Sequence, residues 1–282
     1  MVHALPNEHK LPAIGFGTAD LTGDIKEIIK CAVRCGHRLI DTAAVYGSEE
    51  AVGAALRELE TDGEIRREEL FIETKLEPGR RGYEAVLESF QHALNRLQME
   101  YVDMFLIHWP VPRGSEKTYA EENREIWRAF EALYREGRVR AIGVCNFLER
   151  HLLQIMETCS IAPMLNQLEL HPGYQQRGLV RFCRERGMLI EAWSPMGRGI
   201  LNKPEFQKMA AFYEKDIGQL ALRWSVENGY IPLTRSSAPA HIAKNLEIFN
   251  FALTEDDRDQ LNALNTNDGH MDIWSYRRQQ MY

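Results

Sequence analysis

The chain has 282 residues, and with 44% hydrophobic and 27% charged residues it has the composition of a globular protein with a large core. Its formal net charge of -7 disfavours a surface that binds nucleic acid or an anionic membrane. No apolar run approaches the length of a membrane span, and residues 1–12 lack the apolar core of a signal peptide, so we expect a cytoplasmic protein.

Two short apolar segments, 2–5 and 11–14, predict a hairpin across the floor of a barrel. Apolar, β-branched runs then recur along the chain, and each has the length of a buried strand. The eight predicted strands are 13–17, 38–41, 70–75, 102–108, 139–145, 165–169, 189–194 and 230–233.

Helical patterns lie between these runs. The stretch 83–98 places its apolar side chains on one stripe, namely Val86, Leu87, Phe90, Ala93, Leu94 and Leu97. Asp216 with Gln219 predicts a capping box that opens a helix through Trp224. Thr254 with Asp257 predicts a second capping box near the end of the chain.

Strands that alternate with helices imply right-handed βαβ crossovers and a parallel sheet. Eight such units in 282 residues fit a closed (β/α)8 barrel better than an open sheet with a second domain. No Pro/Ser/Gly-rich stretch offers a domain boundary, so we expect one domain over 1–282. In such barrels the catalytic groups lie at the carboxyl ends of the strands and in the loops that follow.

Four polar residues occupy these strand ends: Asp41, Tyr46 just beyond it, Lys75 and His108. Taken singly, an Asp or Lys at a strand end is more often a capping or solvated residue. Together they make an acid–base site suited to carbonyl reduction, which needs a proton on oxygen. A nearby lysine lowers the pKa of a tyrosine, a carboxylate keeps the lysine charged, and a histidine can orient the carbonyl.

Metal chemistry has no support in the sequence. There is no H-E-x-x-H and no cysteine–histidine cluster, so we expect no metal site. The five cysteines form no C-x-x-C pair and are expected to be free thiols in a reducing compartment.

The motifs around these residues resemble those of the aldo-keto reductases, in particular short bacterial members similar to diketogluconate and aldose reductases. They are D-T-A-x-x-Y-G at 41–47, T-K-L at 74–76, L-I-H-W-P at 106–110, G-V-C-N-F at 143–147, N-Q-L-E-L-H-P at 166–172 and W-S-P-M-G at 193–197. The resemblance implies that Tyr46 is the general acid, that Lys75 and Asp41 tune it, and that His108 positions the substrate.

The same resemblance implies a nicotinamide cofactor. Asn146 and Gln167 would hold its carboxamide, and Trp193 would stack on its ring, although a packed core aromatic is the default for an isolated tryptophan. Cys145 stands where a serine is common in the family. Further implied cofactor contacts are Thr18, Asp41, Ser194, Pro195 and Gly197.

A Rossmann fingerprint is absent, because the G-x-G at 15–17 lacks its third glycine. Residues 232–245 instead resemble the family's motif for the adenosine 2′-phosphate. Arg235 replaces the usual lysine and His241 the usual arginine, and the remaining implied contacts are Ser236, Lys244 and Asn245. We expect a preference for NADPH that is weaker than usual, with NADH use possible. The alternative is that Arg235 and His241 only solvate the start of a helix.

The substrate side departs from the family pattern. Ala19 and Glu77 stand where aromatic walls are frequent, whereas Trp109 is retained. In the tail, Trp274 could restore a wall if residues 265–282 fold over the mouth, but terminal residues are also commonly disordered. The sequence does not name the substrate.

The sequence therefore predicts an NADPH-dependent oxidoreductase that reduces small-molecule aldehydes or ketones. Its partner would be the carbonyl substrate, with no nucleic acid and no membrane, and a monomer is the expected state. A different class, a non-catalytic cofactor-binding redox sensor, remains open because fold alone does not decide function. A third interpretation is a phosphate-binding lyase or isomerase barrel, but the separations between Asp41, Tyr46, Lys75 and His108 would then be a coincidence.

Overall fold

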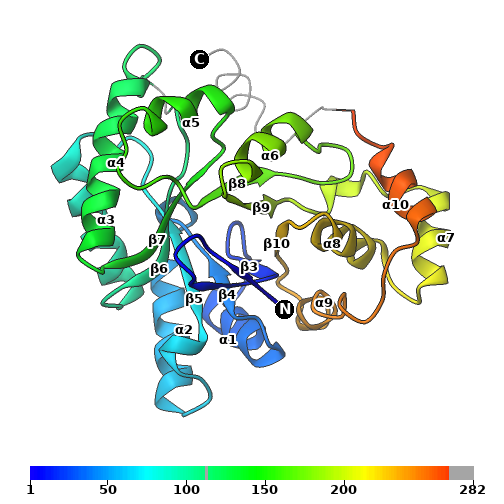
Figure 1. The fold of residues 1–282 in the computed structure, drawn as a ribbon. Coiled ribbons are helices and arrows are strands. Elements are labelled where there is room, and N and C mark those ends of the chain that lie inside the picture. Colours follow the sequence, from blue (N-terminus) through cyan, green and yellow to red (C-terminus); the bar gives the residue numbers. More distant parts are fainter. Residues whose placement is uncertain (112–113, 267–282) are drawn as a thin grey trace.

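The computed structural model describes residues 1–111 and 114–266, which form a closed barrel of eight parallel strands surrounded by helices (Figure 1). The strand order around the barrel is β10-β3-β4-β5-β6-β7-β8-β9. The strands are β3 (Gly15–Gly17), β4 (Leu39–Asp41), β5 (Phe71–Lys75), β6 (Val102–Ile107), β7 (Val139–Cys145), β8 (Leu165–Glu169), β9 (Leu189–Trp193) and β10 (Ile231–Thr234). The predicted (β/α)8 barrel is confirmed, with strand ends shifted by one or two residues.

The predicted N-terminal hairpin is also confirmed. Strands β1 (Val2–Ala4) and β2 (Lys10–Pro12) pair in antiparallel register, with His3 opposite Leu11. Leu5 and Leu11 are buried in one cluster with Leu39 and Phe71, which lie at the beginning of β4 and β5. The hairpin therefore fills the amino-terminal end of the barrel.

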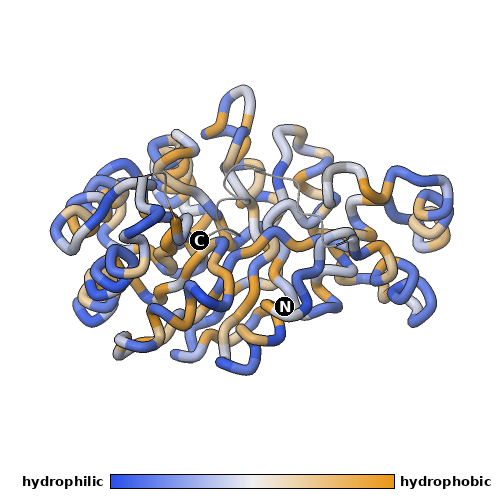
Figure 2. Tube along the Cα trace, turned by 90° about the horizontal axis from the view of Figure 1, so that it is seen from above, coloured by the Kyte–Doolittle hydropathy of each residue, from blue (hydrophilic) through white to orange (hydrophobic). Residues whose placement is uncertain are grey.

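The helices cover the outside of the barrel, and hydrophilic segments lie toward the periphery when it is seen from above (Figure 2). They are α1 (Ile25–Cys35), α2 (Glu49–Thr61), α3 (Tyr83–Leu97), α4 (Tyr119–Arg135), α5 (Glu149–Met156), α6 (Arg177–Arg184), α7 (Pro204–Phe212), α8 (Ile217–Glu227), α9 (Pro239–Lys244) and α10 (Glu255–Asn262). Among the described residues, no helix is long and apolar enough to cross a membrane.

Local sequence patterns predicted the buried face of α3 and the start of α8 correctly. The predicted stripe in α3 packs inward, with Val86, Phe90 and Leu97 fully buried. Asp216 and Gln219 form the reciprocal capping box of α8. At α10 only half of the predicted box is present: Thr254 accepts a bond from the Asp257 amide, but the Asp257 carboxylate accepts from the Thr254 hydroxyl and from Tyr213 instead of the Thr254 amide.

The barrel interior is mostly apolar, but it also holds buried polar side chains, and two glutamates among them matter for the site. Glu73 in β5 and Glu191 in β9 are 0% exposed and lie inside the barrel beside Gln167 of β8. Parallel strands covered on both faces read as nearly continuous apolar runs, so an ionisable side chain within one needs a specific partner.

Candidate active site

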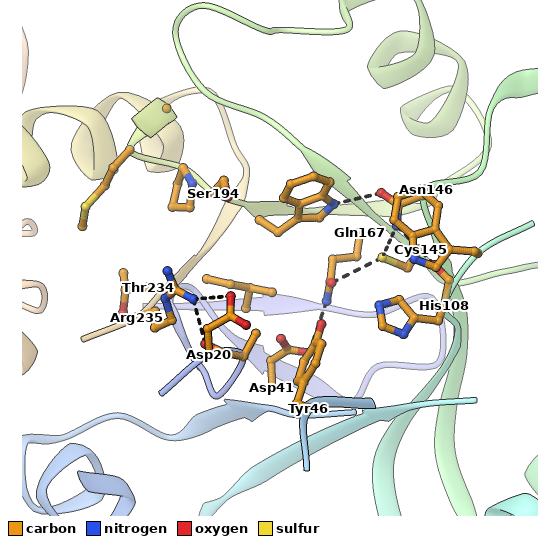
Figure 3. Close-up of a pocket in the computed structure, with 18 residues that line it drawn as sticks. Asp20, Asp41, Tyr46, His108, Cys145, Asn146, Gln167, Ser194, Thr234 and Arg235 are labelled. Atoms are coloured by element: carbon orange, nitrogen blue, oxygen red, sulfur yellow. Dashed lines mark hydrogen bonds and ion pairs between the residues drawn. The ribbon is translucent and has the colours of Figure 1, made fainter. Parts of the chain in front are cut away.

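A cavity of about 500 Å³ opens at the carboxyl ends of the strands (Figure 3). The predicted residues that line it are Ala19, Asp41, Tyr46, His108, Trp109, Cys145, Asn146, Gln167, Trp193, Ser194, Pro195, Gly197 and Arg235. Sequence analysis missed five lining residues, Gly17, Asp20, Met196, Leu233 and Thr234. Each of these five lies at or just after a strand end, and so the same strand-end rule could have found them.

Lys75 lies beneath the cavity and does not line it. Its side chain is 0% exposed and forms an ion pair with Asp41, and its ammonium also donates to the Thr42 carbonyl at 3.2 Å. Burial opposes the charged ammonium, but the Asp41 carboxylate and the neighbouring Tyr46 and Glu73 raise the pKa of Lys75 well above its usual value. Lys75 is therefore a fixed cation under the tyrosine.

Tyr46 is the last residue of a short 3-10 helix, η1 (Ala44–Tyr46), directly after β4. The ammonium nitrogen of Lys75 lies 4.9 Å from the centre of its ring. Burial raises the pKa of Tyr46 more than Lys75 lowers it. The expectation of a lowered pKa is therefore wrong for this structure, because removing the phenolate from water outweighs the lysine charge. The phenol keeps its proton at neutral pH.

His108 follows β6 and faces Tyr46, with the two rings nearly perpendicular and their centres 5.7 Å apart. Burial, and to a lesser extent Lys75, lowers the pKa of His108 to about 3. Its imidazole is therefore neutral, and Nδ1 is buried without a hydrogen-bond partner among the described residues. A neutral imidazole can donate one hydrogen bond to a polar group in the pocket.

Asn146 is held by a network of side chains. Its Oδ1 accepts a bond from the Trp193 indole at 2.9 Å, and its Nδ2 donates to the His108 carbonyl at 3.2 Å and to the Cys145 sulfur at 3.1 Å. Asn146 has a φ of 63°, a left-handed conformation that asparagine tolerates better than most residues. The residue is thus fixed in backbone and side chain.

Gln167 is oriented from inside the barrel. Its Nε2 donates to Glu73 at 2.6 Å and to Glu191 at 3.0 Å. Among the described residues, the one hydrogen bond given to its Oε1 comes from the weak Cys145 thiol at 3.4 Å. Burial raises the pKa of Glu73 well above its usual value and that of Glu191 to about 7. Sequence analysis missed both glutamates, although a charged residue within an apolar strand was the available signal.

The segment predicted to bind the 2′-phosphate lies only partly at the cavity. Arg235 lines it and donates to Asp20 at 2.8 Å and to the Ala19 carbonyl at 2.9 Å. The other predicted contacts of this segment are Ser236, His241, Lys244 and Asn245, and the structure places them along and around α9, outside the lining residues. Ser236 Oγ accepts from the Ala238 amide at 3.0 Å at the start of that helix.

Thr18 lies behind the cavity wall. Its hydroxyl donates to the Asp41 carbonyl at 3.0 Å and bonds to the Ser48 hydroxyl at 2.8 Å. Thr18 is 1% exposed, so in this structure it supports the end of β4. Its predicted contact with a cofactor stays a prediction.

On the predicted substrate side, Ala19 and Trp109 line the cavity. Glu77 pairs with Arg80 at 2.9 Å and does not belong to the lining residues of the described chain. Trp274 and the rest of the predicted cover lie outside the described residues.

Comparisons with known proteins identify the family to which the chain belongs. The family model described as "Aldo/keto reductase family" matches residues 13–266. An uncharacterized oxidoreductase, YtbE, of Bacillus subtilis is 40% identical over 93% of this chain and 92% of its own length. A glyoxal reductase of the same organism is 38% identical over 93% of this chain and 91% of its own. The crystal structure of a Bombyx mori aldo-keto reductase in complex with NADP has a TM-score of 0.90 at 29% identity, covering 98% of this chain and 96% of that one.

Proposed function

Because the chain belongs to the aldo/keto reductase family, we propose that it uses NADPH to reduce the carbonyl group of small aldehydes or ketones, with Tyr46 as the general acid. The observation that carries this proposal is the arrangement at the inner end of the cavity. A buried ion pair lies under a protonated tyrosine, and a neutral histidine faces that tyrosine across 5.7 Å.

The residues around the cavity suit a nicotinamide dinucleotide. The carboxamides of Asn146 and Gln167 lie at one end of the cavity, and the guanidinium of Arg235 lies at the other. The indole of Trp193 is hydrogen-bonded to Asn146. Since the carboxyl groups of Glu73 and Glu191 take the amide hydrogens of Gln167, its Oε1 is the acceptor left for the amide group of a nicotinamide. Arg235 offers the planar donor pair that binds phosphate.

Four side chains of the protein each have a separate role in delivering the proton. When bound, the nicotinamide supplies the hydride that the carbonyl carbon receives. Tyr46 holds the proton that the carbonyl oxygen receives, and the Lys75 cation stabilises the phenolate left behind. Asp41 keeps Lys75 charged and in place, because an unpaired ammonium would be costly in this buried position. Neutral His108 orients the carbonyl by donating a hydrogen bond to its oxygen.

We infer a preference for NADPH over NADH from Arg235, which is the cation that lines the outer end of the cavity. The preference should be moderate, because Arg235 is already paired with a carboxylate. For the substrate, the relative named glyoxal reductase makes small aldehydes the first compounds to test.

The proposal is tested by following NADPH consumption with a panel of aldehydes and ketones, for the wild type and Tyr46→Phe in parallel. Phenylalanine keeps the ring over Lys75 and removes only the proton donor. We expect the wild type to reduce members of the panel and the variant to do so slower by roughly two orders of magnitude or more, the size attributed to general-acid catalysis. Binding of NADPH should be nearly unchanged in the variant.

Two outcomes would contradict the proposal. Full activity of Tyr46→Phe would show that another group delivers the proton. Tight NADPH binding by the wild type with no turnover across the panel would instead favour a cofactor-binding redox sensor.

A further inference from the structure

The loops after β3 and β10 are tied together across the outer end of the cavity. Arg235 Nη1 donates both to Asp20 Oδ2 at 2.8 Å and to the Ala19 carbonyl at 2.9 Å. The Thr22 amide donates to the Ser237 hydroxyl at 3.2 Å. Because β3 and β10 are neighbours in the barrel, these two loops lie side by side, and Figure 3 shows Asp20 and Arg235 in contact at the end of the cavity away from His108.

Asp20 is the only acidic group at that end among the described lining residues, and it is turned toward the cation. Its side chain is 86% exposed, so no packing holds it there, and the partner charge is what fixes its position. Its backbone is in the left-handed region, with a φ of 51°, and its carboxylate accepts a hydrogen bond from Arg235. The loop thus presents a carboxylate to the arginine that the proposed function assigns to a phosphate.

A carboxylate in this place has a specific effect on cofactor choice. A 2′-phosphate that binds Arg235 must displace Asp20 or tolerate its negative charge nearby, and both lower its affinity. A dinucleotide without that phosphate has no such competition. We propose that Asp20 competes with the 2′-phosphate for Arg235 and so reduces the preference for NADPH over NADH. This proposal rests on the proposed function.

The test compares the binding of NADP+ and NAD+ to the wild type and to Asp20→Asn by isothermal titration calorimetry at low salt. Asparagine has the same size and also tolerates a left-handed backbone, so the loop should keep its shape. We expect NADP+ to bind about two- to five-fold more tightly in the variant, as for the loss of one exposed charge interaction, with NAD+ unchanged. The difference should shrink in high salt, because exposed charges are screened.

A matched control is Glu64→Gln, which also removes one exposed carboxylate from an ion pair with an arginine. Glu64 pairs with Arg34 at 2.6 Å, and neither residue is among the described residues that line the cavity. This variant should leave both affinities unchanged, which excludes an effect of net charge alone. In an Arg235→Ala background, Asp20→Asn should change NADP+ affinity less than in the wild type, because the competition for Arg235 is gone and only direct repulsion of the phosphate is left.

The outcomes separate this inference from the function on which it rests. If the wild type binds NADP+ but Asp20→Asn binds it equally or more weakly, the inference is wrong. Equal tightening for both cofactors would point to a change in the loop and would also overturn it. If the wild type binds neither cofactor, the proposed function itself fails.

Discussion

The indole nitrogen of Trp193 donates a hydrogen bond to the side-chain oxygen of Asn146 at 2.9 Å. Trp193 ends β9 and Asn146 follows β7, and the bond fixes the asparagine carboxamide at the wall of the cavity. A phenylalanine or tyrosine at position 193 could cover the same wall, but neither offers a donor at the indole position. The tryptophan therefore joins an aromatic surface to a polar anchor.

Trp193→Phe should show the value of this bond. The ring surface is largely kept, but Asn146 loses a partner, so we expect a loss of about 1 kcal/mol in the free energy of unfolding. Cofactor affinity should fall several-fold, because the amide is no longer held in one orientation. Urea denaturation and quenching of protein fluorescence by NADPH measure the two effects. Unchanged stability together with unchanged affinity would show that the bond has no role.

The buried glutamates should make stability depend on pH. A carboxyl in the unfolded chain loses its proton near pH 4.5, whereas burial raises the pKa of Glu191 and holds its proton to about pH 7. The folded state binds more protons in this window, so its stability decreases as pH rises from about 4.5 to about 7. The slope is at most about 1.4 kcal/mol per pH unit for one such group.

Glu191→Gln isolates this contribution. His37, whose pKa burial lowers to about 4, acts in the opposite direction, and so the difference between variant and wild type is the quantity to follow. We expect the variant to gain stability relative to the wild type between about pH 5 and 7, and the difference to level off above about pH 7. Chemical denaturation across this range measures it. A difference that is constant with pH would mean that Glu191 titrates normally in the folded protein.

Gly53 in α2 allows a sharp test of helix packing. A Cβ at this position would lie too close to the Leu97 carbonyl oxygen at the end of α3, and a backbone atom cannot move aside easily. We expect Gly53→Ala to destabilise the fold by about 1–3 kcal/mol, as overpacking does.

Gly178 in α6 is the matched control, because a Cβ there meets nothing within 4 Å. Gly178→Ala should be neutral or stabilising by roughly 0.5–1 kcal/mol, since alanine favours a helix. Thermal unfolding of both variants gives the comparison. If both lose stability alike, the Leu97 contact does not account for the cost at Gly53.

Much of the barrel could be predicted from sequence because its signals are local. Strands buried on both faces produce short apolar runs, and Asp216 with Gln219 marks a helix start within four residues. The C-terminal ends of those runs then indicated where side chains such as Asp41 and His108 would meet. The strand order followed from the choice of a closed (β/α)8 barrel, in which consecutive strands are neighbours.

The features that sequence analysis missed depend on contacts between distant segments. The hydrogen bond between Asp20 and Arg235 joins residues 215 positions apart, and the sequence around Asp20 does not indicate this partner. Glu73 and Glu191 meet through Gln167 only because the barrel closes. The raised pKa of Tyr46 likewise depends on how much water the finished fold removes, which a lysine 29 positions away in sequence does not reveal.

The hairpin of β1 and β2 bears on the side from which a ligand can reach the cavity. Leu5 and Leu11 pack against the side chains that fill the barrel and cover its amino-terminal end. The cavity lies at the opposite, carboxyl end of the strands. A molecule that binds in it would therefore enter and leave on the side of the barrel away from the hairpin.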